Sequence, residues 1–437
     1  MKTVIMAGGK GTRISSIASD IPKPMIKIDG MPVLEREIYS LRDQGFKDII
    51  ITVGHLGNII INYFGDGHKI SPATGEEFGV DIEYYNEELP LGNAGALYEI
   101  KDKLTEDFLL INGDIIFDID INRFLKFHKS KKTLATVLTH PNNHPYDSGL
   151  IISDQNNIIQ DWLAKEDERP IYYKNRVNAG IHILSPLLLL NRPESEKVDL
   201  DRDILKPNVK KGVIACYDSP EYVRDMGTPE RYNKVASDLR DGIIKSRNLK
   251  TRQKAFFIDR DGTINKHIGF LKKPEEIKLL DGASEAISRI NDSGYLAIII
   301  TNQPVIARGD ITVDELKTIH NALETQLGNE HAYIDAIYYC PHHPDSGFKG
   351  EVKELKIDCE CRKPKAGLLF KAANDYNIDL TDSFMIGDSD IDIAAGVAAG
   401  CKTGLIIDKQ KLESDLVSNF TGKSLLEIVE KCLRKEQ

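Results

Sequence analysis

Two short segments of the chain carry residue types that handle phosphate. Residues 6–13, MAGGKGTR, follow an apolar run and precede PKP at 22–24, while residues 259–263, DRDGT, end a second apolar run. Glycines let backbone amides approach phosphate oxygens without a Cβ in the way. Two carboxylates two residues apart at a strand end can attack a phosphorus and transfer a proton. The sequence therefore predicts one site that holds a nucleoside triphosphate and another that removes a phosphate.

The elements that must position the first segment alternate between strand and helix. Residues 3–6 and 49–53 are expected as buried parallel strands, with a helix at 32–43 between them, and the runs 109–112 and 133–139 continue the pattern. This alternation is typical of a doubly wound α/β sheet, which we expect to extend to about residue 239.

A second α/β unit is predicted to begin with the strand at residues 255–258, ahead of DRDGT. Its later strands are expected at 296–300, 336–339, 383–386 and 403–407, with a closing helix at 424–435. The chain of 437 residues can bury a core in each unit. We therefore predict a first domain at 1–240, a polar, basic linker at 241–253 and a second domain at 254–437.

Composition narrows the classes of function. The net charge of −10 argues against a nucleic-acid binder, so bound phosphates must be met by local cations and metals. No apolar run is long enough to span a bilayer, and the N-terminus lacks the pattern of an export signal, so we expect a cytoplasmic protein without a membrane partner. Three of the six cysteines cluster with histidines, which in a reducing compartment suggests a metal rather than disulfides.

Further motifs follow the first segment in a fixed order. They are LGNAGA at 91–96, NGD at 112–114, VNAG at 177–180 and RDMGTPE at 224–230. Together with AGGKGTR and PKP they resemble the sugar-1-phosphate nucleotidyltransferase family over residues 1–235. The resemblance implies a GT-A-like fold in which a sugar 1-phosphate oxygen attacks the α-phosphorus of a nucleoside triphosphate and pyrophosphate leaves.

The resemblance also assigns residues to roles. Arg13 would hold the pyrophosphate, Lys23 would stabilise charge on the α-phosphate, and Asp114 and Asp225 would bind Mg²⁺ through hard carboxylate oxygens. The nucleotide would contact Gly8, Gly9, Gly11, Thr12, Gly92 and Asn112, and the sugar phosphate would contact Lys165, Asn178 and Gly180. Lys165 lies in AKE, where the family usually has EKP, so this position departs from the pattern.

Two alternatives remain open for this half. A glycine-rich loop after a strand can also be a tight turn or a dinucleotide-binding loop. Glu87 or Glu88 can accept the two adjacent donors of guanine, N1–H and N2–H₂, and either can equally be a solvated charge.

The second segment resembles the opening motif of the haloacid dehalogenase phosphatase superfamily. The other motifs of the superfamily follow in the expected order, as Thr301, Lys363 and GDSDID at 387–392. The resemblance makes Asp259 the nucleophile that forms an aspartyl phosphate and Asp261 the general acid and base. Thr301 would bind the phosphoryl group, Lys363 would neutralise charge, and Asp388 would be the principal Mg²⁺ ligand, with Asp259 and Asp261 completing the magnesium set. A calcium-type loop or an ordinary strand-end turn is the alternative for the opening motif.

Cysteines and histidines lie among these phosphatase motifs, in CPHHP at 340–344 and CECRKP at 359–364. Three thiolates and one imidazole make a closed structural zinc site. The predicted ligands are Cys340, His342, Cys359 and Cys361, with His343 as the competing imidazole. Zinc would staple a long loop whose end delivers Arg362 and Lys363 to the phosphatase site.

This loop, with DRDGTIN at 259–265, TNQ at 301–303 and IARG at 306–309, resembles the D-glycero-D-manno-heptose 1,7-bisphosphate 7-phosphatase family. The histidinol-phosphate phosphatase domain is the nearest relative of that family. Asn302, Arg308 and Arg362 would contact the sugar phosphate, with the Arg362 guanidinium on the distal 1-phosphate. The sequence GDSD departs from the family, which carries a lysine after the motif aspartate.

The two resemblances fit end to end. Removal of the 7-phosphate from heptose 1,7-bisphosphate gives heptose 1-phosphate, the kind of acceptor that a sugar-1-phosphate nucleotidyltransferase uses. We therefore predict a bifunctional enzyme of GDP-heptose biosynthesis that uses GTP and the α-anomer. The alternatives are another sugar or base (ADP-heptose or a GDP-hexose), a histidinol-phosphate phosphatase half, and a non-catalytic regulator that binds nucleotide sugars. The sequence leaves a homo-oligomer open.

Overall fold

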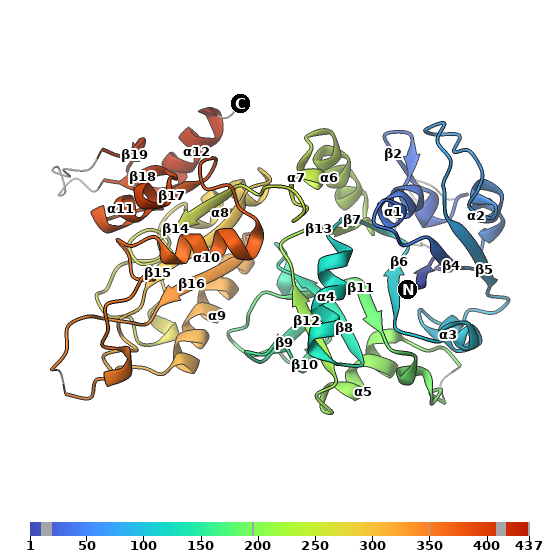
Figure 1. Ribbon diagram of the computed structural model, residues 1–437, viewed down its shortest axis with the longest axis horizontal. Coiled ribbons are helices and arrows are strands. Elements are labelled where there is room, and N and C mark those ends of the chain that lie inside the picture. Colours follow the sequence, from blue (N-terminus) through green and yellow to red (C-terminus); the bar gives the residue numbers. More distant parts are fainter. Residues whose placement is uncertain (10–19, 195, 348, 408–416, 436–437) are drawn as a thin grey trace. The chain divides into compact units, whose positions relative to one another are not determined.

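The computed structural model describes residues 1–9, 20–194, 196–347, 349–407 and 417–435. Its internal contacts divide the chain into two compact units (Figure 1). Unit 1 comprises residues 1–140, 151–162 and 178–248, and unit 2 comprises residues 141–150, 163–177 and 249–437. No described helix is long and apolar enough to cross a membrane.

Unit 1 is built on a nine-stranded mixed sheet. At its centre β1 (Thr3–Met6) pairs in parallel with β4 (Asp48–Val53) on one side and β6 (Phe108–Asn112) on the other. The remaining strands are β5 (Asp81–Asn86), β8 (Ala135–His140), β9 (Leu150–Ser153), β10 (Ile159–Leu163), β11 (Val177–Leu184) and β12 (Ile214–Asp218). The central strands are mostly apolar and, apart from a residue at one end of each, buried, as expected for strands covered on both faces.

Helices connect and cover these strands. They are α1 (Val33–Arg42), α2 (Gly57–Phe64), α3 (Gly95–Glu99), α4 (Ile121–Lys131), α5 (Lys206–Val209), α6 (Pro229–Arg240) and α7 (Ile243–Ser246). Helix α4 begins at Asp120, whose carboxylate accepts from the Arg123 backbone N–H at 3.1 Å and so caps the helix. Helix α7 falls within the stretch predicted to be a linker.

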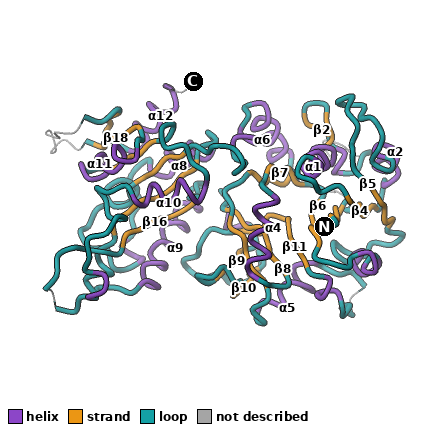
Figure 2. The backbone as a smooth tube through the Cα atoms, viewed as in Figure 1, coloured by secondary structure: helices purple, strands orange, loops and turns teal. Residues whose placement is uncertain are grey.

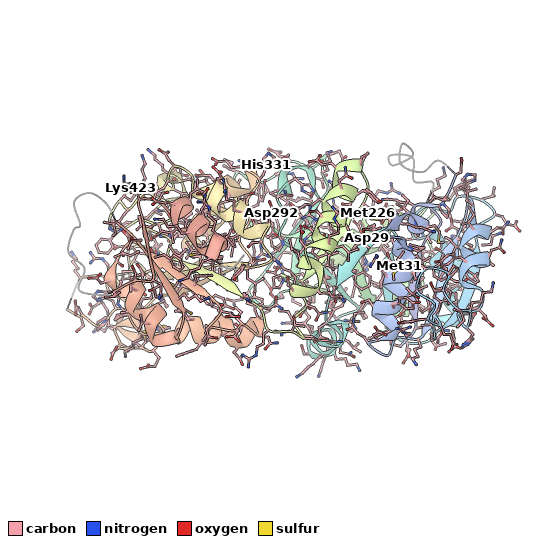
Figure 3. The ribbon with its side chains drawn as sticks, turned by 90° about the horizontal axis from the view of Figure 1, so that it is seen from above. Asp29, Met31, Met226, Asp292, His331 and Lys423 are labelled. Carbon is pink, nitrogen blue, oxygen red and sulfur yellow. The ribbon has the colours of Figure 1, made fainter. Side chains whose placement is uncertain are left out.

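Two small antiparallel pairs complete unit 1. β2 (Lys27–Ile28) pairs with β3 (Met31–Pro32), and β7 (Ile115–Asp118) pairs with β13 (Tyr222–Asp225). Met226 is fully buried in the apolar cluster that joins them, and Figure 3 labels it with Met31 of the first pair. The pairing of β7 with β13 matters for the site, because it brings the ends of two distant motifs together.

Unit 2 contains a six-stranded parallel sheet in the order β16-β15-β14-β17-β18-β19. The strands are β14 (Ala255–Ile258), β15 (Leu296–Asn302), β16 (Ala336–Cys340), β17 (Phe384–Gly387), β18 (Lys402–Ile406) and β19 (Phe420–Gly422). The helices are α8 (Ala283–Asn291), α9 (Val313–Asn329), α10 (Gly367–Tyr376), α11 (Asp390–Ala399) and α12 (Leu425–Lys435), and Figure 2 shows them beside the strands.

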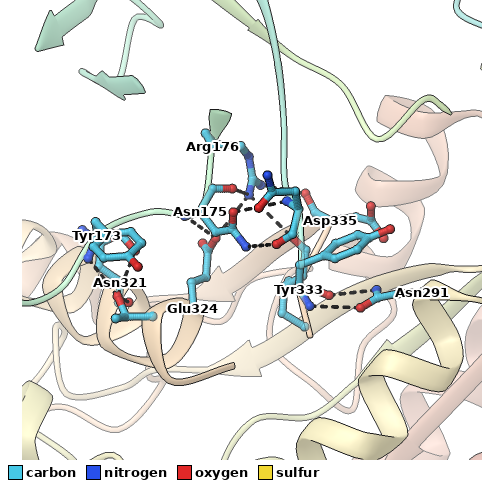
Figure 4. A network of polar contacts seen from close by, with 11 residues as sticks. Tyr173, Asn175, Arg176, Asn291, Asn321, Glu324, Tyr333 and Asp335 are labelled. Atoms are coloured by element: carbon cyan, nitrogen blue, oxygen red, sulfur yellow. Dashed lines mark hydrogen bonds and ion pairs between the residues drawn. The ribbon is translucent and has the colours of Figure 1, made fainter. Parts of the chain in front are cut away.

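Unit 2 also includes residues 141–150 and 163–177, which lie within the predicted first domain. Arg176, 5% exposed, donates to Glu324 of α9 at 3.2 Å and to the Asp335 carbonyl at 2.9 Å (Figure 4). The Asn175 backbone N–H donates to the same glutamate at 3.1 Å. A buried ion pair loses much of its attraction to desolvation, so its clearest effect is to fix one packing arrangement of segment 163–177 on α9.

The predicted α/β fold class is confirmed in both units. The boundaries differ by one or two residues, with α1 at Val33–Arg42 instead of 32–43 and α12 at Leu425–Lys435 instead of 424–435. Parallel strands flanked by helices, rather than residue-by-residue propensity, carried that prediction.

Candidate functional site

Unit 1 has a depression of about 1020 Å³ at the carboxyl ends of its central strands. Its lining includes predicted nucleotide and phosphate contacts, namely Gly8, Gly9, Lys23, Gly92, Asn112 and Asp114. The other residues predicted for the same loop, Gly11, Thr12 and Arg13, lie outside the described residues. The ends of parallel strands are the usual place for a ligand in a sheet of this type.

The loop that carries Gly92 packs against the backbone of Val198, which is distant in the sequence. Gly92 has φ of 88°, and a Cβ there would lie 2.3 Å from the Val198 carbonyl oxygen. Backbone hydrogen bonds join Ala94 to that oxygen at 3.0 Å and Val198 to the Leu91 oxygen at 2.8 Å. Glycine is thus required at this position, and the loop edge of the depression is fixed.

Lys23 and Asp114 line the depression, and Asp225 lies close to them. Lys23 forms an ion pair with Asp114, and a Cβ on Gly227 would lie 3.8 Å from the same ammonium. Asp225 accepts from the Arg231 guanidinium at 2.6 Å and from the Gly227 backbone N–H at 2.8 Å. Burial would raise the pKa of Asp225, but Arg231, with Gly227 and Lys23, outweighs burial and holds the pKa below its usual value. These contacts therefore favour the charged form of the Asp225 carboxylate.

Two acidic residues line the other end of the depression. Glu87 and Glu88 follow β5, and Glu87 is half-buried, with Oε1 2.8 Å from where a Gly8 Cβ would stand. Burial raises the pKa of Glu87, and the Leu91 backbone N–H opposes this. The Glu87 carboxylate thus lies beside Gly8 of the glycine-rich loop.

The predicted sugar contacts Asn178 and Gly180 lie on β11. A Cβ on Gly180 would lie 2.7 Å from the Asn112 amide nitrogen, so β11 and β6 meet there. The Asn178 amide oxygen accepts from the Gly180 backbone N–H at 3.0 Å, and its amide nitrogen donates to both oxygens of Asp201 at 3.3 Å. Burial, with Asp199, raises the pKa of Asp201 to about 6. Asp201 lacks a motif of its own, and the sequence did not reveal it.

Lys165 lies elsewhere, in segment 163–177 of unit 2. Its ammonium pairs with Asp147, and its side chain is 57% exposed. A role for Lys165 in binding sugar phosphate stays a prediction.

The centre of the second site is a buried lysine between two carboxylates. Lys363 lies 2.5 Å from Asp259 at the end of β14, 2.6 Å from Asp392 of α11, and donates to the Ile300 carbonyl at 2.7 Å. Burial raises the pKa of Asp259, and the Lys363 ammonium opposes this rise. Burial works to lower the pKa of Lys363, but Asp259 and Asp392 outweigh it, so the lysine stays charged. Asp392 was part of the predicted GDSDID segment but had no role assigned.

Asp261 is held by four donors from three side chains. Oδ2 accepts from Arg260 Nε at 3.1 Å, Arg260 Nη2 at 2.7 Å and Gln303 Nε2 at 3.0 Å, whereas Oδ1 accepts from Asn265 Nδ2 at 3.0 Å. Burial works to raise the pKa of Asp261, but these groups, led by Arg260, outweigh burial and leave the pKa below its usual value. These four hydrogen bonds therefore hold the Asp261 carboxylate in one orientation.

The predicted Thr301 and Asn302 end β15 at the same edge of the sheet. Thr301 is 1% exposed, and its hydroxyl accepts from Gln303 Nε2 at 2.9 Å. Asn302 exchanges two hydrogen bonds with the Lys363 backbone, at 3.0 and 3.1 Å. The Asn302 amide therefore fixes the loop that delivers the lysine.

Three carboxylates, from Asp259, Asp388 and Asp392, offer oxygens within 4.8 Å of one another. Gly262, with φ of 94°, allows this approach, because a Cβ there would lie 2.3 Å from Asp388 Oδ2. Carboxylate oxygens grouped in this way are the hard ligands that Mg²⁺ prefers, so the site fits such a divalent cation. Among the described residues the Asp261 carboxylate is not part of this group.

Cys340, His342, Cys359 and Cys361 form a second cluster. Their sulfur atoms are 3.3–3.6 Å apart, and His342 Nδ1 lies 3.3 Å from the Cys361 sulfur. Thiolates around one tetrahedral zinc ion lie about 3.7 Å apart, so the set fits zinc. His343, the competing imidazole, instead accepts from the Asp345 backbone N–H at 3.2 Å.

The remaining arginines flank this cluster and the site. Arg362 Nη1 donates to the His342 carbonyl at 3.2 Å, next to Lys363. Arg308 donates to Asp310 at 3.0 Å and stacks 4.2 Å over the Phe270 ring. Neither contact tests the predicted role of these arginines in binding sugar phosphate.

Comparison with known proteins gives a match in each half. Residues 2–242 match the family model described as Nucleotidyl transferase, and residues 360–423 match HAD-hydrolase-like. A D-glycero-beta-D-manno-heptose-1,7-bisphosphate 7-phosphatase of Haemophilus influenzae is 39% identical over 178 residues, which are 40% of this chain and 94% of that protein.

Two solved structures are also similar. HddC from Yersinia pseudotuberculosis is 26% identical, with a TM-score of 0.45, over 55% of this chain and 99% of that one. The D,D-heptose 1.7-bisphosphate phosphatase from B. bronchiseptica, complexed with magnesium and phosphate, is 31% identical, with a TM-score of 0.37, over 42% of this chain and 99% of that one.

Proposed function

Because this chain belongs to the nucleotidyl transferase family and its C-terminal region to the family of the heptose-1,7-bisphosphate 7-phosphatases, we propose two consecutive reactions on one sugar. The chain removes the 7-phosphate of D-glycero-α-D-manno-heptose 1,7-bisphosphate. It then transfers GMP from GTP to the heptose 1-phosphate and releases pyrophosphate. The observation that carries the proposal is the cluster of Lys363, Asp259 and Asp392 beside Asp261. This cluster lies in the C-terminal region, whose relatives are named as heptose-1,7-bisphosphate 7-phosphatases.

In the phosphatase reaction an Asp259 oxygen attacks phosphorus, and the bond to the sugar oxygen breaks as Asp261 protonates that oxygen. Water then attacks the aspartyl phosphate, gives its proton to Asp261, and frees Asp259 and phosphate. Lys363 neutralises charge between the nucleophile and the phosphoryl group. Mg²⁺ held by Asp259, Asp388 and Asp392 would lower the repulsion between the two anions.

In the transferase reaction the depression of unit 1 receives both substrates. Lys23 would stabilise the charge on the α-phosphate during transfer, and Asp114 and Asp225 would hold Mg²⁺. Asn178 and Gly180 would contact the sugar, since Gly180 packs against Asn112, which lines the depression. The depression of about 1020 Å³ lies at the upper end of ligand-pocket sizes, as two substrates require.

Guanine selection is assigned to the Glu87 carboxylate. Guanine presents two adjacent donors, N1–H and N2–H₂, which a carboxylate accepts together, and adenine presents no such pair. Glu87 lies beside Gly8 of the phosphate loop and lines the depression with Glu88. Glu87→Gln should therefore lower the preference for GTP over ATP, with Glu99→Gln, outside the depression, as the matched control. An unchanged choice of nucleotide in Glu87→Gln and Glu88→Gln together would remove this assignment.

The anomer is the second feature to test, because the curated relative is named for the β-anomer. We propose the α-anomer because the N-terminal motifs resemble those of a guanylyltransferase of the GDP-heptose route. Each anomer of the bisphosphate is offered with each common nucleoside triphosphate and Mg²⁺, and the products are followed by mass. GDP-heptose from the α-anomer alone supports the proposal, and ADP-heptose from the β-anomer refutes its base and its anomer.

A further inference from the structure

The sequence motif TNQ contains a residue, Gln303, that the two reactions leave without a role. Gln303 is 3% exposed and follows β15, directly beyond Thr301 and Asn302. Its amide nitrogen donates to Asp261 Oδ2 at 3.0 Å and to the Thr301 hydroxyl oxygen at 2.9 Å. A single buried amide thus bridges the acid–base carboxylate and the phosphate-binding hydroxyl.

The orientation of this amide follows from its partners. A carboxylate only accepts hydrogen bonds, so the amide nitrogen, and not its oxygen, must face Asp261. The same nitrogen then donates to the Thr301 oxygen, which leaves the Thr301 proton free to point elsewhere. Thr301 therefore acts as a donor, which is the polarity that phosphoryl oxygens need.

The two oxygens of Asp261 are also made unequal. Oδ2 accepts three hydrogen bonds, two from Arg260 and one from Gln303, while Oδ1 accepts one, from Asn265. Arg260 is fully buried, and its Nε and Nη2 both donate to this oxygen, which fixes the guanidinium against Asp261. The crowded oxygen has no room for a proton.

We propose that Gln303 is a positioning residue that, together with Arg260, confines the catalytic proton of Asp261 to Oδ1 and sets the Thr301 hydroxyl as a donor to the phosphoryl group. In the first step the proton on Oδ1 passes to the leaving sugar oxygen as its bond to phosphorus breaks. In the second step Oδ1 takes a proton from the attacking water. Gln303 itself exchanges no proton and forms no covalent bond.

The backbone of Gln303 explains how its side chain keeps this place. Its N–H donates to the Cys340 carbonyl at 2.8 Å, and Cys340 is one of the four residues of the cysteine–histidine cluster. The cluster therefore holds the two sides of the active site, Lys363 through the loop and Asp261 through Gln303.

The test compares substrates whose leaving groups differ in their need for a proton. Gln303→Met keeps the shape of the side chain and removes its donors. We expect the rate on an alkyl phosphate, the heptose bisphosphate, to fall about tenfold or more, because general acid catalysis supplies 10²–10⁴-fold. The rate on p-nitrophenyl phosphate, whose leaving group needs no proton, should fall much less, and inhibition by inorganic phosphate should weaken. Gln326→Met, which loses one hydrogen bond to the Ile277 carbonyl on the same unit, is the matched control.

Gln303→Glu keeps the same shape but faces Asp261 with a carboxylate, so its selective loss on the alkyl phosphate should exceed that of Gln303→Met. It also carries the comparison if the methionine variant fails to fold. Equal losses on both substrates with unchanged inhibition by phosphate, or a fully active Gln303→Glu, would overturn the proposal.

This inference rests on the phosphatase reaction proposed above, and the two can fail separately. A wild-type protein that cleaves p-nitrophenyl phosphate and a simple alkyl phosphate, but not the heptose bisphosphate, would refute the proposed substrate. The leaving-group comparison of the Gln303 variants would then be made with the simple alkyl phosphate.

Discussion

Each unit places a lysine against an aspartate, but the two pairs differ in their access to water. Lys363 is 1% exposed, and its partners Asp259 and Asp392 are 9% and 1% exposed. Lys23 is 11% exposed, and Asp114 is 36% exposed. The proposed reactions account for this difference, because a covalent nucleophile would have to be held in place by the protein, whereas the two substrates of a transferase would themselves fill the site.

The largest expected effect breaks the buried pair. Asp259→Asn removes the nucleophile, so phosphate release should fall on the order of 10⁴-fold or more. Transfer of GMP to heptose 1-phosphate should be unchanged, since the pair Lys23 and Asp114 is untouched. Steady-state assays of both reactions check this, with the exposed Asp314→Asn as control. Unchanged phosphate release would remove the nucleophile assignment.

The corresponding change in unit 1 is Lys23→Met. Loss of one charge that stabilises the transition state should slow nucleotidyl transfer about 10²–10³-fold. Phosphate release should be normal, and the exposed Lys27→Met should retain both activities. A Lys23→Met protein with normal transferase activity would show that the Lys23–Asp114 pair has only a structural role.

The cysteine–histidine cluster should matter only to the buried site. Cys361→Ser should abolish zinc binding, because three ligands hold the ion weakly, and should lower phosphatase activity ~10- to 100-fold through the loop that carries Lys363. Transferase activity should remain. Metal content per chain is measured together with both activities, and Cys401→Ser, outside the cluster, is the control. A zinc-free protein with full phosphatase activity would contradict this account.

The smallest expected effect concerns Glu37, a buried acid that interacts with Asp114 of the Lys23–Asp114 pair. Burial, with Asp114, raises the pKa of Glu37 well above its usual value. The proton is bound more tightly in the folded state, so this group stabilises the fold below the unfolded pKa and loses that contribution as pH rises. Glu37→Gln should therefore gain melting temperature relative to wild type between pH 5 and pH 8, at about 2–4 °C per kcal/mol. A difference that is constant with pH, as expected for the exposed control Glu106→Gln, would show that Glu37 is not the group responsible.

Sequence reasoning predicted the buried site around Lys363 in unit 2 more fully than the open site, the depression of unit 1. Asp259 and Asp388 each follow a strand of a parallel sheet and Thr301 lies at the end of another, so order along the chain predicts that they meet at one edge. Asp392 and Gln303 were in the quoted motifs, but their roles depend on which atoms they face. Arg260 was also part of the quoted motif DRDGT, but no sequence pattern shows that an arginine is fully buried and donates to Asp261.

The open site depends on packing between distant segments, which no motif records. Asp201 reaches Asn178 only through the fold, and Gly92 requires the backbone of Val198 beside it. Segment 163–177 shows the same limit, because its attachment to Glu324 of α9 places Lys165 in unit 2. Local pattern predicted the elements, and tertiary contacts decided the neighbours.

The central claim is that one chain first dephosphorylates and then activates the same sugar. The most direct measurement supplies heptose 1,7-bisphosphate, GTP and Mg²⁺ to Asp259→Asn, to Lys23→Met and to their mixture, and follows nucleotide sugars by mass. We predict that neither variant alone makes GDP-heptose, that the mixture does, and that Asp259→Asn makes it from heptose 1-phosphate. A GDP-heptose 7-phosphate product from Asp259→Asn, or no product from the wild-type chain, would contradict the account.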